Sequence, residues 1–130
     1  MRSDTSTGYI DGFVFPILEE YLDTYKQIAQ EVAEIWKDHG ALAYQEFVSD
    51  DLFLESTASF SSTLDLAENE VAVLGWVTFP SKRIRDKANA SVPKDPRMSK
   101  LVAPLMDPEK PIFDAKRMVY GGFKPLVKSA

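Results

Sequence analysis

The sequence predicts an α+β domain of the ferredoxin-like βαββαβ type, a four-stranded antiparallel sheet with helices on one face. Segments of β character and amphipathic helical segments alternate in that order along the chain. At 130 residues the chain has the length of one domain that buries its own core, and it contains no cysteine for disulfides or thiolate metal sites. We therefore place a single domain at residues 8–124, between a flexible N-terminus at 1–7 and a C-terminal tail at 125–130.

The first two elements are a strand at residues 9–17 and a long helix that begins at Glu19. The strand segment is rich in aromatic and β-branched residues. In the helix, apolar residues recur every three or four positions and form one stripe, namely Leu22, Tyr25, Ile28, Ala29, Val32, Ile35 and Trp36. Gly40 suits a left-handed cap, and the helix dipole favours a cation at His39. A capping role therefore explains His39, the only histidine, better than catalysis or metal binding does.

The two central strands are expected at residues 41–48 and 70–79, where β-branched and aromatic residues recur. Between them, residues 52–68 are rich in Ser and Thr and predict a long connection or a ragged extension of the strand.

The second half of the chain predicts two helices and a last strand. A helix from residue 82 to about 92 follows the N-cap Ser81, buries Ile84, Ala88 and Val92, and exposes its charged residues, Arg85 among them. Asp95 and Pro96 predict the start of a short helix. The last strand is expected at 113–123, where Gly121-Gly122 indicates a bulge or a close backbone approach.

Both faces of the predicted sheet carry large apolar residues. Phe13 and Phe15 alternate with Val14, and Trp76 alternates with Val77. Helices cover one face of a ferredoxin-like sheet, so the other face needs a second cover to stay out of water. The sequence therefore predicts a homodimer in which two copies of the sheet pack together.

The net charge of −5 conceals two halves of opposite sign. Residues 1–70 hold 15 acidic and three basic side chains, and residues 71–130 hold five acidic and 12 basic ones. The basic half could contact nucleic acid, but the negative total favours an acidic helix beside a basic one, within the chain or across a dimer. No apolar run reaches the ~18 residues that span a bilayer, and the first residues lack the apolar core of a signal peptide. We expect a cytoplasmic protein without membrane contact.

Glu46 is the first candidate site residue, because it shares a strand face with Leu42, Tyr44 and Val48. A carboxylate among apolar neighbours is ion-paired, solvent-facing, or an acid/base group with a raised pKa. We favour the ion pair, with Arg117 as the partner.

Two further groups of polar residues are candidates. Arg85 and Asn89 are four apart on one helix, and Arg97 could join them to clamp a carboxylate or phosphate; the alternative is a solvated helix face. Asp114, Lys116, Arg117 and Tyr120 crowd into the last strand and line either the cleft between sheet and helices or an inter-subunit seam. No Walker loop, dinucleotide fingerprint, serine-nucleophile elbow or zinc pattern is present.

Several short motifs spread over residues 8–124 belong together. They are Tyr-Ile-Asp-Gly-Phe-Val at 9–14, Gly-Ala-Leu at 40–42 followed by Glu46, Trp76 with Phe79-Pro80-Ser81, Arg85-Asp86 with Asn89, Asp95-Pro96-Arg97-Met98, and a segment from Phe113 that ends in Lys-Arg-Met-Val-Tyr-Gly-Gly-Phe at 116–123. With them the chain resembles the small bacterial YbaA-like family, domain of unknown function 1428. The resemblance implies a dimeric α/β barrel and no established activity. The chain departs from the family pattern at Ala115, where glycine is usual, and at residues 108–111, which look like extra loop.

Three functions remain open on this sequence. The first is a homodimeric cytoplasmic protein that binds or converts a small anionic or polar molecule in a cleft between sheet and helices. Its polar contacts would be Glu46, Arg85, Asn89, Arg97, Asp114 and Arg117, with Trp76 and Tyr120 as walls. The alternatives are an interaction or structural protein without catalytic activity, and an RNA-associated protein. No cofactor or metal is expected, and the sequence does not decide whether the protein is an enzyme.

Overall fold

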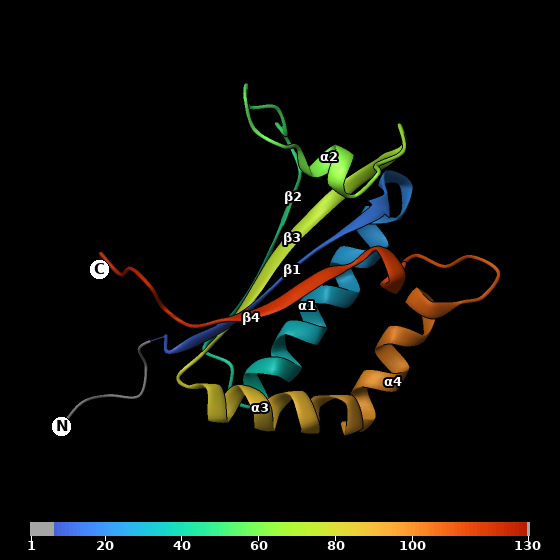
Figure 1. Ribbon diagram of the computed structural model, residues 1–130. Coiled ribbons are helices and arrows are strands. Elements are labelled where there is room, and N and C mark those ends of the chain that lie inside the picture. The colour runs from blue at the N-terminus through green and yellow to red at the C-terminus, as the bar shows by residue number, and fades with distance from the viewer. Residues whose placement is uncertain (1–6, 130) are drawn as a thin grey trace.

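Four strands form one antiparallel sheet in the spatial order β2-β3-β1-β4, and the long helices lie along one of its faces (Figure 1). The strands are β1 (Tyr9–Leu18), β2 (Ala43–Val48), β3 (Glu70–Phe79) and β4 (Val119–Phe123). The helices are α1 (Leu22–Asp38), α3 (Lys82–Ser91), α4 (Pro96–Val102) and the single turn α2 (Phe60–Thr63). This arrangement confirms the ferredoxin-like prediction. The computed structural model describes residues 7–129, so the N-terminus expected at 1–7 lies almost wholly outside the described residues.

The main core forms where β1 and β3 face α1. Successive side chains of a strand point to opposite faces, so Phe13, Phe15 and Ile17 of β1 all point toward the helices. Phe15 is 2% exposed and packs edge-on against Tyr25 of α1, with ring centroids 5.4 Å apart. Loss of a fully buried aromatic side chain typically costs about 3–5 kcal/mol, so this contact fixes α1 against the centre of the sheet.

The opposite face of the sheet is only partly covered. At one end, Leu64, just after α2, buries Val14 and Ala72. Four other apolar side chains on this face are between 40% and 58% exposed: Phe47, Leu74, Val119 and Phe123. We call this surface the open face.

The last strand is shorter than predicted. The sequence indicated a strand over residues 113–123, but residues 115–117 form a 3₁₀ turn and β4 begins at Val119. The register places Val119 opposite Val14, so an extended strand would put Arg117 opposite Pro16 of β1. Proline has no N–H to continue the ladder on that edge, and β4 therefore stops short of it.

The end of α1 is tied to the start of α4. The His39 ring contacts Asp95 Oδ2 at 2.9 Å through Nε2 and Ser91 Oγ at 3.0 Å through Nδ1. Asp95 caps α4, as predicted, by accepting from Arg97 N. Arg97 also donates to Asp38 at 2.8 Å. The acidic and basic halves of the chain therefore meet where α1 ends and α4 begins.

Candidate functional site

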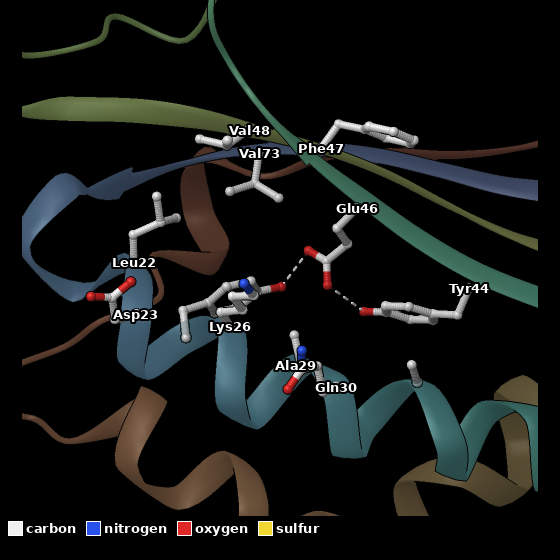
Figure 2. A pocket seen from close by; sticks show the side chains of 12 residues that line it. Leu22, Asp23, Lys26, Ala29, Gln30, Tyr44, Glu46, Phe47, Val48 and Val73 are labelled. Atoms are coloured by element: carbon white, nitrogen blue, oxygen red, sulfur yellow. Dashed lines mark hydrogen bonds between the residues drawn. The ribbon is translucent and has the colours of Figure 1, made fainter.

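The Glu46 carboxylate lies between the sheet and α1 and is held by two tyrosine hydroxyls. It projects from β2 toward the helix (Figure 2). Tyr25 of α1 donates to its Oε2 at 2.5 Å, and Tyr44 of β2 donates to its Oε1 at 3.0 Å. Among residues 7–129, no Lys, Arg or His nitrogen forms an ion pair with Glu46 within 4.0 Å. The carboxylate therefore has hydrogen-bond donors but no counter-ion.

Burial raises the pKa of Glu46 above its ordinary value, although the hydrogen bonds from Tyr25 and Tyr44 act in the other direction. Burial and the nearby carboxylate also raise the pKa values of both tyrosines. The two hydroxyls therefore stay protonated and donate at physiological pH. A carboxyl group with a raised pKa in a cleft is suited to accept or release a proton.

Two cavities adjoin this cluster. The outer cleft, of about 490 Å³, lies between α1 and β2 and is lined by residues that include Lys26, Gln30, Glu46 and Val48. The inner cavity, of about 420 Å³, lies between the sheet and the helices α1 and α4. Tyr25, Ala29 and Tyr44 line both, so their side chains form the wall between the two spaces.

The inner cavity has a mainly apolar lining. Aromatic and aliphatic side chains come from the sheet, from α1, and from α4 and the turn after it; they include Phe13, Phe15, Trp36, Met98 and Leu105. Its polar lining residues Asp11, Asn89 and Tyr120 come from β1, α3 and β4. Such a space suits an apolar body with few polar groups.

Arg85 belongs to a structural network rather than to an open anion clamp. Its Nε donates to the buried Asp11 at 2.8 Å, its Nη1 to Asp86 at 2.8 Å and its Nη2 to Tyr120 Oη at 3.2 Å. The prediction that Arg85 is exposed is wrong, because its side chain is only 15% exposed. All three guanidinium nitrogens already have protein acceptors.

Gly122 makes room for this network. A side chain there would collide with the Tyr9 hydroxyl and with Arg85 Nη2. The predicted bulge at Gly121-Gly122 is absent, because both glycines pair in regular register with Gly12 and Asp11. The close approach at this position comes from side chains. Asn89 completes the network by donating to Tyr120 Oη at 3.3 Å.

Arg117 does not pair with Glu46. It donates to both carboxylate oxygens of Glu70, at 2.7 and 3.0 Å, and to the carbonyl oxygens of Leu64 and Asp65. The predicted partner is wrong because Arg117 lies in the 3₁₀ turn before β4, beside the connection that leads into β3. Its guanidinium fastens these two segments together.

Three other predicted contacts lie away from the cavities. Arg97 binds Asp95 and Asp38 instead of joining Arg85 and Asn89, because α4 starts beside the end of α1. Asp114 caps the turn at 115–117 by accepting from Lys116 N. Trp76 is on the open face, where it donates to Gln45 and stacks on Phe47. Trp76 therefore cannot be a wall of a cleft between sheet and helices.

The residues that sequence reasoning missed are Tyr25, Tyr44 and Asp11. Tyr25 was assigned to an apolar stripe, and this assignment takes no account of the hydroxyl group at the end of the tyrosine ring. The spacing of Tyr44 and Glu46, two residues apart in a strand, was the available signal, since it places both side chains on one face.

Within residues 7–129, no group of three or more acidic, histidine or cysteine side chains is arranged to hold a metal ion. Across the same span, no helix combines the length and the hydropathy that a membrane crossing requires.

Residues 8–114 match the family model described as a protein of unknown function, DUF1428. The chain belongs to this family. It is 35% identical over 119 residues to the uncharacterized protein YbaA of Escherichia coli K12, an alignment that covers 92% of this chain and 97% of the relative. The matched span contains every residue of the Glu46 cluster and both Arg85 and Asn89.

Solved structures of other proteins share the fold of this DUF1428 chain at low sequence identity. A nipsnap family protein of unknown function from Agrobacterium tumefaciens has a TM-score of 0.55 at 16% identity, over 92% of this chain and 88% of that one. A dimeric ferredoxin-like protein from an uncultured marine organism has a TM-score of 0.57 at 10% identity, over 98% and 96%. These likenesses show the fold alone.

Proposed function

We propose that this DUF1428 protein is a homodimer that binds a small molecule between its sheet and α1, with Glu46 as the polar group that meets the ligand. The observation that carries this proposal is the position of Glu46. Its carboxylate is partly buried, has no counter-ion within 4.0 Å among residues 7–129, and lines a cleft whose tyrosine wall also bounds the inner cavity. A fold that needed only packing at this position would use an apolar side chain, since an uncompensated carboxylate opposes folding.

The outer cleft favours a ligand with an apolar body and one polar end. The volumes of both cavities lie in the range of ~300–1,000 Å³ that small-molecule sites occupy. The outer cleft offers Tyr25, Tyr44 and Val48 to the apolar body, and it offers Glu46, Lys26 and Gln30 to the polar end. Asn89 and Tyr120 remain candidate contacts at the inner cavity, whereas Arg85 positions Tyr120.

A dye-binding experiment tests the ligand site. N-phenyl-1-naphthylamine is a neutral apolar dye whose fluorescence rises in apolar surroundings. Ala29 lines both cavities, so Ala29→Leu should fill space in each and weaken dye binding. Gln27→Leu adds the same side chain at an exposed position of the same helix and should leave binding unchanged. Equal binding by the wild-type protein and Ala29→Leu would contradict the proposal.

The open face supports the homodimer. Phe47, Leu74, Val119 and Phe123 together form an apolar surface that no described segment covers. The marine ferredoxin-like protein, which shares the fold, is itself described as dimeric.

The expected mass in solution is that of two chains. Sedimentation equilibrium over a wide concentration range measures it directly, and a chain that stays monomeric at every concentration would contradict the dimer. RNA association has less support, because Arg85, Arg97 and Arg117 each pair with carboxylates of the chain itself. Their charge is therefore partly neutralised before any phosphate arrives.

A further inference from the structure

The hydrogen bonds of Glu46 leave half of its accepting capacity unused. A carboxylate offers about four lone-pair directions over its two oxygens. Tyr25 occupies one direction on Oε2, and Tyr44 occupies one on Oε1. The remaining directions have no donor among the described side chains, and the outer cleft opens beside them. A ligand with several N–H groups at one atom can therefore bind both oxygens without displacing either tyrosine.

The charge around the outer cleft is also uncompensated. Every lining residue except Val73 comes from residues 22–48, in the acidic half of the chain. The lining contains Asp23 and Glu46 as acids and Lys26 as the one base among its described residues. Residues 1–70 hold 15 acidic and three basic side chains, so the surrounding potential is negative and attracts cations.

The aromatic wall adds a second feature that suits a cation. The rings of Tyr25 and Tyr44 line the cleft beside the carboxylate. The faces of aromatic rings carry partial negative charge and attract ammonium groups that lie within about 6 Å of the ring centre. A carboxylate flanked by two such rings therefore offers both charge and polarisable surface to one cationic group.

We propose that the outer cleft binds a small primary amine in its ammonium form, with the nitrogen beside Glu46 and the apolar body against Tyr25, Tyr44 and Val48. This inference rests on the proposed small-molecule site and names the class of its ligand. An ammonium group supplies up to three N–H donors and neutralises the carboxylate. An alcohol of the same size supplies one O–H and leaves the charge in place, and a carboxylate ligand adds a second negative charge.

Lys26 is the internal competitor for this position. It lines the same cleft from α1, but it forms no ion pair with Glu46 within 4.0 Å. Its side chain is exposed and pays no desolvation penalty where it lies. Removal of a competitor cannot weaken binding of the amine. Replacement of Lys26 by methionine should therefore not reduce the affinity for the amine.

Three probes of nearly equal size separate charge from shape. They are phenethylamine, 2-phenylethanol and phenylacetate, titrated into the full-length protein at neutral pH and followed by NMR chemical shifts. We expect phenethylamine to bind about tenfold or more tightly than 2-phenylethanol, because only the ammonium group pairs its charge with the carboxylate. Tenfold corresponds to about 1.4 kcal/mol. Phenylacetate should bind most weakly.

Glu46→Gln removes the charge and keeps the shape, so this variant should bind phenethylamine and 2-phenylethanol with about equal affinity. Glu31→Gln removes one acid at an exposed position of α1 outside the cleft, and it should retain the preference. Lys26→Met should bind the amine at least as tightly as the wild-type protein does.

The outcomes separate the two proposals. If none of the probes binds in the cleft, the small-molecule site itself is wrong. If the probes bind but the alcohol or the acid matches the amine, or Glu46→Gln keeps the preference, the site stands and the amine class is wrong. If Lys26→Met abolishes binding of the amine, the ligand depends on Lys26 and the amine class is again wrong.

Discussion

Glu46 and Gly75 are register partners on β2 and β3, and the missing side chain of Gly75 leaves the space in which Glu46 turns toward α1. A Cβ on Gly75 would lie 2.9 Å from Glu46 Cγ and 2.5 Å from the Phe13 ring. Contacts that short do not occur in real proteins without a shift of one partner. The glycine therefore sets the position of the carboxylate as directly as the tyrosines do.

Gly75→Ala should displace Glu46 from the tyrosines. The Phe13 ring is packed against Phe15 and Tyr44, so the added methyl group pushes on the more mobile Glu46 side chain as well as on the ring. We expect lower thermal stability and an altered pH titration of the Glu46 carboxyl carbon, measured by NMR.

Gly12→Ala is the matched control for this change. Its added Cβ would make an ordinary contact of 3.6 Å with Phe123 on the open face. It should leave the Glu46 titration unchanged. The same titration in the wild-type protein and Gly75→Ala would contradict the role of Gly75.

Glu46→Gln should stabilise the protein at neutral pH. Because the pKa of Glu46 is raised in the folded state, the folded state binds the proton more tightly than the unfolded state does. The free energy of unfolding of the wild-type protein therefore falls as pH rises from about 4.3, the ordinary Glu value, through the folded-state pKa. The free energy of unfolding of the Glu46→Gln variant has no such fall. Its greater stability is therefore complete above the folded-state pKa and disappears in acid.

Urea unfolding between acidic and neutral pH measures this difference. The titratable groups that line the same cleft are Asp23, Tyr25 and Lys26 from α1 and Tyr44 from β2. Glu31→Gln, on the exposed side of α1, should show no advantage that depends on pH in this range. A Glu46→Gln protein less stable than wild type at neutral pH would show that the tyrosine hydrogen bonds outweigh the burial of the charge.

Arg85→Met should destabilise the fold, because Arg85 binds the Asp11 carboxylate and not an anionic ligand. Asp11 is only 3% exposed, and removal of its cationic partner leaves a buried charge. Such a change costs about 3–5 kcal/mol in other proteins. Arg83→Met changes an exposed arginine on the same helix and should be nearly neutral in urea unfolding. Equal stability of the two variants would contradict the structural role of Arg85.

Phe47→Lys should convert the proposed dimer into monomers, because it places a charge on the open face. Val48→Lys is its control. The two residues are neighbours on β2 with similar exposure, 51% and 48%, but alternation along the strand puts Val48, the partner of Val73, on the α1 side. Sedimentation equilibrium should give one chain for Phe47→Lys and two for Val48→Lys. The same mass for both variants would place the association elsewhere.

The sequence predicted the architecture well where periodicity or capping residues carry the signal. The stripe that includes Tyr25, Val32 and Ile35 predicted α1, and Ser81 and Asp95 predicted the starts of α3 and α4, where both act as N-caps. The last strand was predicted too long because the effect of Pro16 depends on which strand lies beside it. Pairing across the sheet is a property of register, which local composition does not specify.

The candidate site was harder to predict than the fold. Glu46 was identified from its place among apolar residues, but its partner depends on which helix crosses β2. Arg117 was proposed as that partner, but it precedes β4 in a 3₁₀ turn, and β2 and β4 lie at opposite edges of the sheet. Tyr25 lies 21 residues away in sequence from Glu46, so only the folded chain brings them together. Trp76 was assigned to a pocket because its face could not be fixed without the strand register.

Glu46 and Phe47 are consecutive residues of an edge strand, and they point to opposite sides of the sheet. One peptide unit therefore joins the proposed ligand cleft to the surface proposed for association. A rotation or translation of β2 that improves packing on one side necessarily repositions the side chain on the other. If dimerisation changes the affinity of the proposed cleft for its ligand, the ligand must in turn shift the monomer–dimer equilibrium.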